Sequence, residues 1–164
     1  MAGMSGDAVA SAQEHEARII ERCGWAVRGV FGAEDGSTPE FAYTVGLHLR
    51  GLPELIIFGL QYLVAGSILN ALADQMLRDG VKDERLLEGP RALPGCPARL
   101  FALSGVAGML VDEASVVLRH SDGRAAVLQV CWSDEMGRFP WAAGFNEQLA
   151  DLQPLFGHAP GAAH

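Results

Sequence analysis

The sequence predicts an α+β protein with a single domain, in which a mixed β-sheet is flanked by helices. The length of 164 residues fits one domain with a proper core. A hydrophobic fraction of 49% with 20% charged residues is typical of a folded globular chain. Segments with helical periodicity also occur beside segments that alternate as strands do. We therefore expect one domain over residues 1–164, with flexible ends at about 1–7 and 158–164.

Residues 8–23 predict the first helix. Asp7 can cap its N-terminus, and Gly24 is a suitable stop. Apolar side chains share roughly one helical face, namely Val9, Ala12, Ile19, Ile20 and Cys23.

Two strands are predicted next, at residues 25–31 and 41–47, because apolar side chains alternate along both segments. The segment between them contains Asp35-Gly36 and Pro39, which favour turns. We expect a hairpin whose loop is longer than two residues, so the sequence leaves its register open.

Residues 53–59 form a short apolar run that is typical of a central strand covered on both faces. Apolar residues in the segment 60–80 recur at intervals of three and four residues, as on one face of a helix. The segment ends at Gly80, a suitable C-cap. We expect this second helix and the first to cover the same side of the sheet.

The second half of the chain alternates loops and strands. Three prolines and two glycines make 88–97 a loop, and 99–106 and 125–132 are strand-like. Residues 112–120 fit either a short helix or a strand, and we favour the helix because Asp112 can cap it.

The charge and cysteine content exclude several classes of protein. A net charge of −8 and a single lysine, Lys82, argue against nucleic acid as a partner and against a polybasic membrane anchor. The apolar stretches are too short or too Gly-broken to span a membrane. Three separated cysteines suggest reduced thiols, and no targeting pattern is recognisable, so we expect a cytoplasmic protein.

Familiar catalytic motifs are missing from the sequence: there is no Walker loop, GxGxxG, GxSxG or HExxH. The histidines occur without metal-ligand spacing, so no metal site is predicted and the cofactor stays unknown. Two clusters remain that could carry function.

The first cluster is residues 41–48, FAYTVGLH. As a strand it places Phe41 and Tyr43 on one face and Thr44, Gly46 and His48 on the other. Gly46 would permit close approach of a ligand, with His48 able to exchange a proton. The alternative is a strand packed tightly on a helix at Gly46, with His48 solvated at the strand end.

The second cluster is residues 132–141, a polar turn framed by Trp132 and Trp141. Aromatic rings together with Asp134 and Arg138 suit a recognition patch. Alternatively, Asp134 bonds the amides of its own turn while the aromatic rings cover the edge of the core.

The sequence resembles a small bacterial family carried as a domain of unknown function. The resemblance spans about residues 20–157 and rests on FAYTVGLH (41–48), PELIIFGL (53–60), LQVCW (128–132) and GRFPW (137–141). It implies no settled activity, cofactor or catalytic residue. Ser133 is a departure, because similar sequences tend to have Pro before the Asp.

We expect a binding module for a small molecule or a protein, and the chain could form a homo-oligomer. Its ligand-binding residues would come from both clusters: Tyr43, Thr44, His48, Trp132, Asp134, Arg138 and Trp141. One alternative is a hydrolase-like or transferase-like enzyme with His48 as general base, supported by Asp134 or Tyr43, and Glu135 is a further possible partner for His48. Another is a structural or immunity-type partner protein.

Overall fold

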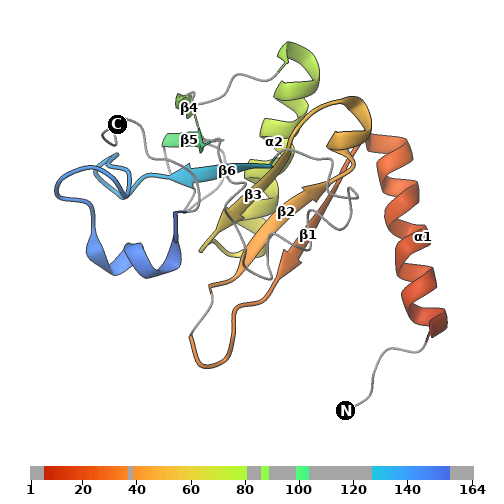
Figure 1. Ribbon diagram of the computed structural model, residues 1–164, viewed down its shortest axis with the longest axis horizontal. Helices are drawn as coiled ribbons and strands as arrows, with labels where there is room; N and C mark the ends of the chain where they lie inside the picture. The colour runs from red at the N-terminus through yellow and green to blue at the C-terminus, as the bar shows by residue number, and fades with distance from the viewer. Residues whose placement is uncertain (1–5, 37–38, 81–85, 89–98, 104–126, 156–164) are drawn as a thin grey trace.

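The computed structural model describes residues 6–36, 39–80, 86–88, 99–103 and 127–155. Within them, six strands form one sheet in the order β1-β2-β3-β6-β5-β4 (Figure 1). The strands are β1 Ala26–Val30, β2 Phe41–Val45, β3 Glu54–Phe58, β4 Leu86–Glu88, β5 Arg99–Leu103 and β6 Val127–Trp132. Only the β3–β6 pair is parallel among these strands, so the sheet is mixed. The predicted α+β class is confirmed.

The predicted hairpin is present as the antiparallel pair β1–β2. Its register, which the sequence left open, pairs Ala26 with Val45 and Val30 with Phe41. β3 lies between β2 and β6, and all five of its residues are buried. The short apolar run at 53–59 therefore does form a central strand, as its lack of polar alternation indicates.

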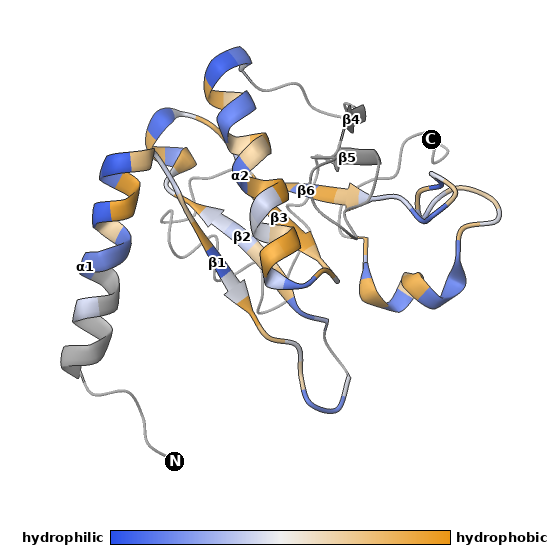
Figure 2. Cartoon of the chain, turned by 180° about the vertical axis from the view of Figure 1, so that it is seen from behind, coloured by the Kyte–Doolittle hydropathy of each residue, from blue (hydrophilic) through white to orange (hydrophobic). Residues whose placement is uncertain are grey.

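Helix α2, Tyr62–Asp79, covers one face of the sheet and contacts β1, β2 and β3. Figure 2 shows it in front of these strands. Its buried residues, such as Ile68 and Leu69, pack with Leu55 and Ile57 of β3 in the largest core cluster. Full burial stabilises each such side chain by roughly 1.5–3 kcal/mol, so the apolar stripe of α2 holds it on the sheet.

Helix α1, Gly6–Cys23, packs on the other face, so the expectation that both helices cover one side is wrong. Its Ile20 contacts the cluster of Phe41, Tyr43 and Ile56, whose side chains point away from α2. Its Glu16 pairs with Arg28, which stands opposite Tyr43 in the register. An apolar stripe shows that a helix is amphipathic, but it does not say which face of a sheet the helix covers.

β2 is shorter than predicted, because it ends at Val45. Gly46 adopts a left-handed conformation, with φ of 114°, and starts the 3-10 helix η1, Leu47–Arg50. A Cβ on Gly46 would lie 2.9 Å from Cγ2 of Ile20. Gly46 therefore marks close packing on a helix, as one interpretation held, but it lies outside the strand, and His48 lies in η1.

Three elements were not predicted: η1, β4, and the 3-10 helix η3, Glu147–Leu152. The helix favoured at 112–120, most of the loop at 88–97 and the chain ends at 1–5 and 156–164 lie outside the described residues. Gly6 and Asp7, which were expected in the flexible end, form the start of α1 instead. In the described part of the chain, no helix is long and apolar enough to cross a membrane.

Candidate functional site

A buried carboxylate joins the end of β2, η1 and the start of β3. Glu54 is the first residue of β3, and its side chain is 1% exposed. Its Oε2 accepts a hydrogen bond from Thr44 Oγ1 at 2.5 Å, and its Oε1 lies 2.8 Å from Nδ1 of His48. Thr44 and His48, both predicted as site residues, are thus brought together by a third residue.

The same carboxylate also fixes the backbone of the turn. Glu54 Oε1 accepts hydrogen bonds from the amides of Gly46 at 2.9 Å and His48 at 3.0 Å. Thr44 Oγ1 in turn accepts one from the Leu55 amide at 2.8 Å. Four donors around one carboxylate compensate the cost of burying its charge, so Glu54 holds the β2–η1 turn in a single conformation.

The His48 side chain is 17% exposed, so it is not the solvated residue that one interpretation expected. A carboxylate at Nδ1 favours the tautomer with the proton on that nitrogen, which leaves the lone pair on Nε2. This is the orientation in which an imidazole can accept a proton from a second molecule. Glu54 was missed because it begins an otherwise apolar run; an acid in that position was the available signal.

Asp134 has a different set of partners, all from its own turn and the segment after it. Its carboxylate accepts hydrogen bonds from the amides of Met136, Arg138 and Asn146 and from Nε of Arg138, at 2.9–3.1 Å. Burial acts to raise the pKa of Asp134, but the bonds from Arg138, Asn146 and Met136 outweigh it and lower that pKa. The Asp134 carboxylate is satisfied by the amides of its own turn together with Arg138 and Asn146, which agrees with the second interpretation of this cluster.

The aromatic residues beside this turn serve mainly to pack the core edge. Trp132 is buried and donates from Nε1 to the Phe58 carbonyl at 2.7 Å. Trp141 is half-buried and stacks on Phe139, with ring centroids 5.0 Å apart. Tyr43 is buried under α1. Of the predicted aromatic ligand residues, Trp141 alone keeps a partly exposed ring.

The two predicted clusters lie at opposite ends of the sheet. His48 contacts Glu54, which pairs with Val127 at the start of β6. Asp134 lies two residues beyond Trp132, the end of β6, and the five residue steps from Val127 to Trp132 span about 16 Å. The carboxylate beside His48 is therefore that of Glu54, and neither Asp134 nor its neighbour Glu135 reaches it.

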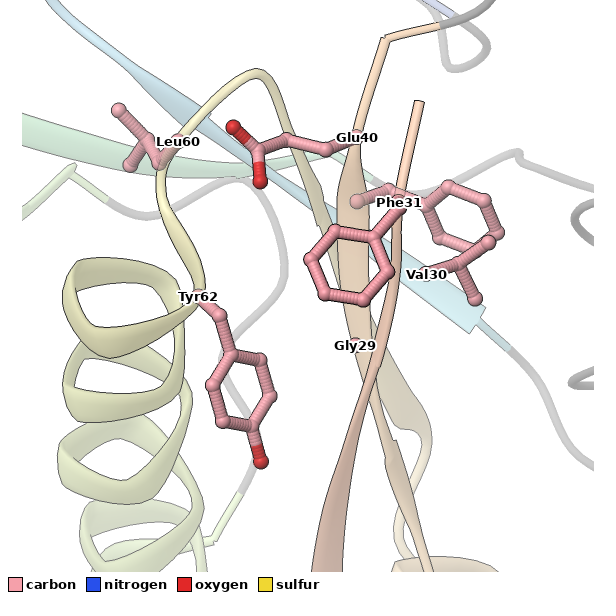
Figure 3. A pocket seen from close by; sticks show the side chains of 7 residues that line it. Gly29, Val30, Phe31, Glu40, Leu60 and Tyr62 are labelled. Atoms are coloured by element: carbon pink, nitrogen blue, oxygen red, sulfur yellow. The ribbon is translucent and has the colours of Figure 1, made fainter. Parts of the chain in front are cut away.

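A cavity of about 280 Å³ opens where β1 ends and α2 begins. It is lined by Gly29, Val30, Phe31, Glu40, Phe41, Leu60 and Tyr62, and we call it the β1–α2 pocket. Figure 3 shows the rings of Phe31 and Tyr62 beside the space, with the Glu40 carboxylate pointing toward Leu60. None of these residues except Phe41 belonged to a predicted cluster.

Exposure of the aromatic rings distinguishes this pocket from the rest of the described surface. Phe31 is 89% exposed and Tyr62 is 47% exposed. Large apolar side chains gathered on a surface cavity are typical of a binding site. The sequence signal was weak, because Phe31 looked like the last alternating residue of a strand.

Within the described residues, no group of three or more His, Cys, Asp or Glu side chains is placed to hold a metal ion. The expectation that no metal site exists is a prediction about the whole chain, and residues such as Cys96 and His120 lie outside the described part.

Comparison with known proteins gives one match. No curated protein and no solved structure matches the chain. The model of a family described as "Domain of unknown function (DUF4262)" matches residues 19–146, which covers both motif clusters, the Glu54 network and the β1–α2 pocket. The chain belongs to the DUF4262 family.

Proposed function

We propose that the protein is a binding module and that its ligand occupies the β1–α2 pocket. The observation that carries this proposal is the pair of exposed rings, Phe31 and Tyr62, beside the Glu40 carboxylate in a single cavity. Exposed aromatic surface is unfavourable in water, and a ligand that covers both rings would recover this free energy.

Tyr62 is held in place by the chain, which supports a preformed site. A Cβ on Gly29 would overlap the Tyr62 ring, so only glycine lets the ring lie against β1. The Tyr62 hydroxyl donates to the Val27 carbonyl at 3.3 Å. A ring fixed at both ends loses little conformational freedom when a ligand binds, which favours affinity.

The location is also one that binding proteins use. The pocket lies beside the loop that joins the end of β3 to the start of α2, and β3 runs parallel to β6. In open sheets with parallel strands, ligands bind beyond the carboxyl ends of those strands.

Native mass spectrometry tests the proposal. The protein is mixed with the protein-free small-molecule fraction of its own cells, and a retained added mass is expected. Phe31→Ala should lose that mass, whereas Leu63→Ala should keep it, because Leu63 is 82% exposed on the same helix turn but does not line the pocket. Equal retention by both variants would place the ligand elsewhere and contradict the proposal.

A second function, acid-base catalysis at His48, is favoured by the 2.8 Å contact between Nδ1 and Oε1 of Glu54. In this proposal His48 is the general base and Glu54 is a positioning residue. Hydrolysis of an activated acyl ester tests it. His48→Gln should abolish the protein-dependent rate, and His15→Gln, at an exposed position of α1, should not. Equal rates for the two variants would remove this function.

A further inference from the structure

We infer that the ligand of the β1–α2 pocket is a small organic cation, that is, an amine or quaternary ammonium compound with an apolar body. The inference rests on the proposed function and specifies its ligand class. It follows from the electrostatic situation of Glu40, the size of the cavity and the character of its walls.

Glu40 lines the pocket with a carboxylate that no described residue neutralises. Its backbone carbonyl accepts a hydrogen bond from the Gly59 amide at 2.8 Å, which fixes the main chain beside the cavity. The side chain itself has no hydrogen bond or ion pair with the described residues, in contrast to the carboxylates of Glu54 and Asp134. A carboxylate without a protein partner at a surface cavity depends on water for its solvation.

A ligand that fills the cavity displaces part of this water. A neutral apolar ligand would leave the carboxylate poorly solvated and unpaired, which is costly, and an anion would be repelled. A cation restores the lost solvation by forming an ion pair next to the apolar walls. The other lining residues include no Lys, Arg or His that could take this role.

The walls are also suited to a cation. The rings of Phe31 and Tyr62 both reach the cavity, and their negatively polarised faces attract ammonium groups at short range. A volume of about 280 Å³ lies slightly below the range of about 300–1,000 Å³ for drug-sized ligands, so it accommodates a compact amine and excludes a dinucleotide.

Isothermal titration calorimetry with two matched compounds tests the inference. Choline carries a quaternary ammonium, and dimethylbutanol is its neutral carbon isostere of nearly the same shape. We expect choline to bind about tenfold more tightly than dimethylbutanol. Glu40→Gln should remove this preference, whereas Glu34→Gln, which neutralises an exposed acid outside the pocket, should keep it.

The outcomes separate the two proposals. Equal affinity for both compounds, with binding lost in Phe31→Ala, would overturn the inference that the ligand is a cation. The pocket would still be a binding site. Binding of neither compound at millimolar concentration would overturn the cation inference, whereas the binding-site proposal is decided separately by the retained mass in Phe31→Ala and Leu63→Ala. Choline binding that Glu40→Gln does not weaken would show that the carboxylate is not the recognition group, and it would also overturn the inference.

Discussion

Glu54 is the residue on which the local structure around His48 depends. It is the one acid in a strand that is otherwise apolar, and its carboxylate accepts hydrogen bonds from one hydroxyl, two amides and one imidazole. Its replacement would leave several buried donors without an acceptor, and such donors are costly in a protein interior.

We expect Glu54→Gln to lower the free energy of unfolding by about 3 kcal/mol, because the amide cannot accept from all of these donors. Urea denaturation measures this difference. Glu34→Gln, at an exposed loop position, is the control and should change it by less than about 0.5 kcal/mol. If the two variants were equally stable, Glu54 would not be the organising group of the turn.

Asp134 makes the stability of the protein depend on pH at acidic values. Its pKa in the folded state lies below the value of about 3.9 for an unfolded chain, so its contribution is complete above that value and is lost as pH falls through the folded-state pKa. In Asp134→Asn, the free energy of unfolding should therefore decrease less as the pH falls from about 5 to about 2. Unfolding curves recorded across this pH range measure the dependence of the unfolding free energy on pH, with Glu135→Gln, at an exposed position, as control. If this dependence is the same in Asp134→Asn as in the unchanged protein, Asp134 is not its source.

Cys131 and Cys23 should differ in chemical reactivity. Burial raises the pKa of the Cys131 thiol to about 12, whereas Cys23 is exposed. Because the thiolate is the reactive form, iodoacetamide at neutral pH should modify Cys23 in the folded protein and reach Cys131 only after unfolding. Peptide mapping by mass spectrometry distinguishes the two sites. Equal modification of both in the folded state would contradict the burial of Cys131.

Glycines determine where strands and helices give way to loops. Gly59 and Gly51 share the left-handed conformation, with φ of 83° and 72°, but their surroundings differ. A Cβ on Gly59 would overlap the carbonyl of Leu152 in η3, whereas a Cβ on Gly51 would meet nothing within 4 Å.

Gly51→Ala should therefore report the backbone cost alone, about 1–2 kcal/mol of unfolding free energy. Gly59→Ala should cost at least about 1 kcal/mol more, because η3 must also move away from the β3–α2 loop. Thermal or urea unfolding measures both variants. A Gly59 variant as stable as the Gly51 variant would mean that the η3 contact contributes nothing.

Most of the described elements could be predicted from sequence, because their signals are local. Apolar spacing indicates α1 and α2, alternation indicates β1 and β2, and a continuous apolar run indicates β3. The end of β2 was misplaced because Gly46 fits a strand pattern as well as a left-handed turn. The three-residue strand β4 carries too little pattern to be detected.

The candidate sites depend on contacts between distant segments, which local sequence patterns do not contain. The sequence singled out His48 and Asp134, but β3 and β6 run parallel, which separates the N-terminal end of one from the C-terminal end of the other. The β1–α2 pocket combines a strand end, a strand start and a helix start. Nothing in the sequence of any one of these segments marks it as a site.

Amide chemical-shift mapping of isotope-labelled protein, titrated with choline, tests most directly whether this pocket binds a ligand. We predict shifts concentrated on Gly29, Val30, Phe31, Leu60 and Tyr62, and their loss in Phe31→Ala. Shifts that cluster around His48 instead, or that persist in Phe31→Ala, would contradict the assignment of the β1–α2 pocket as the binding site.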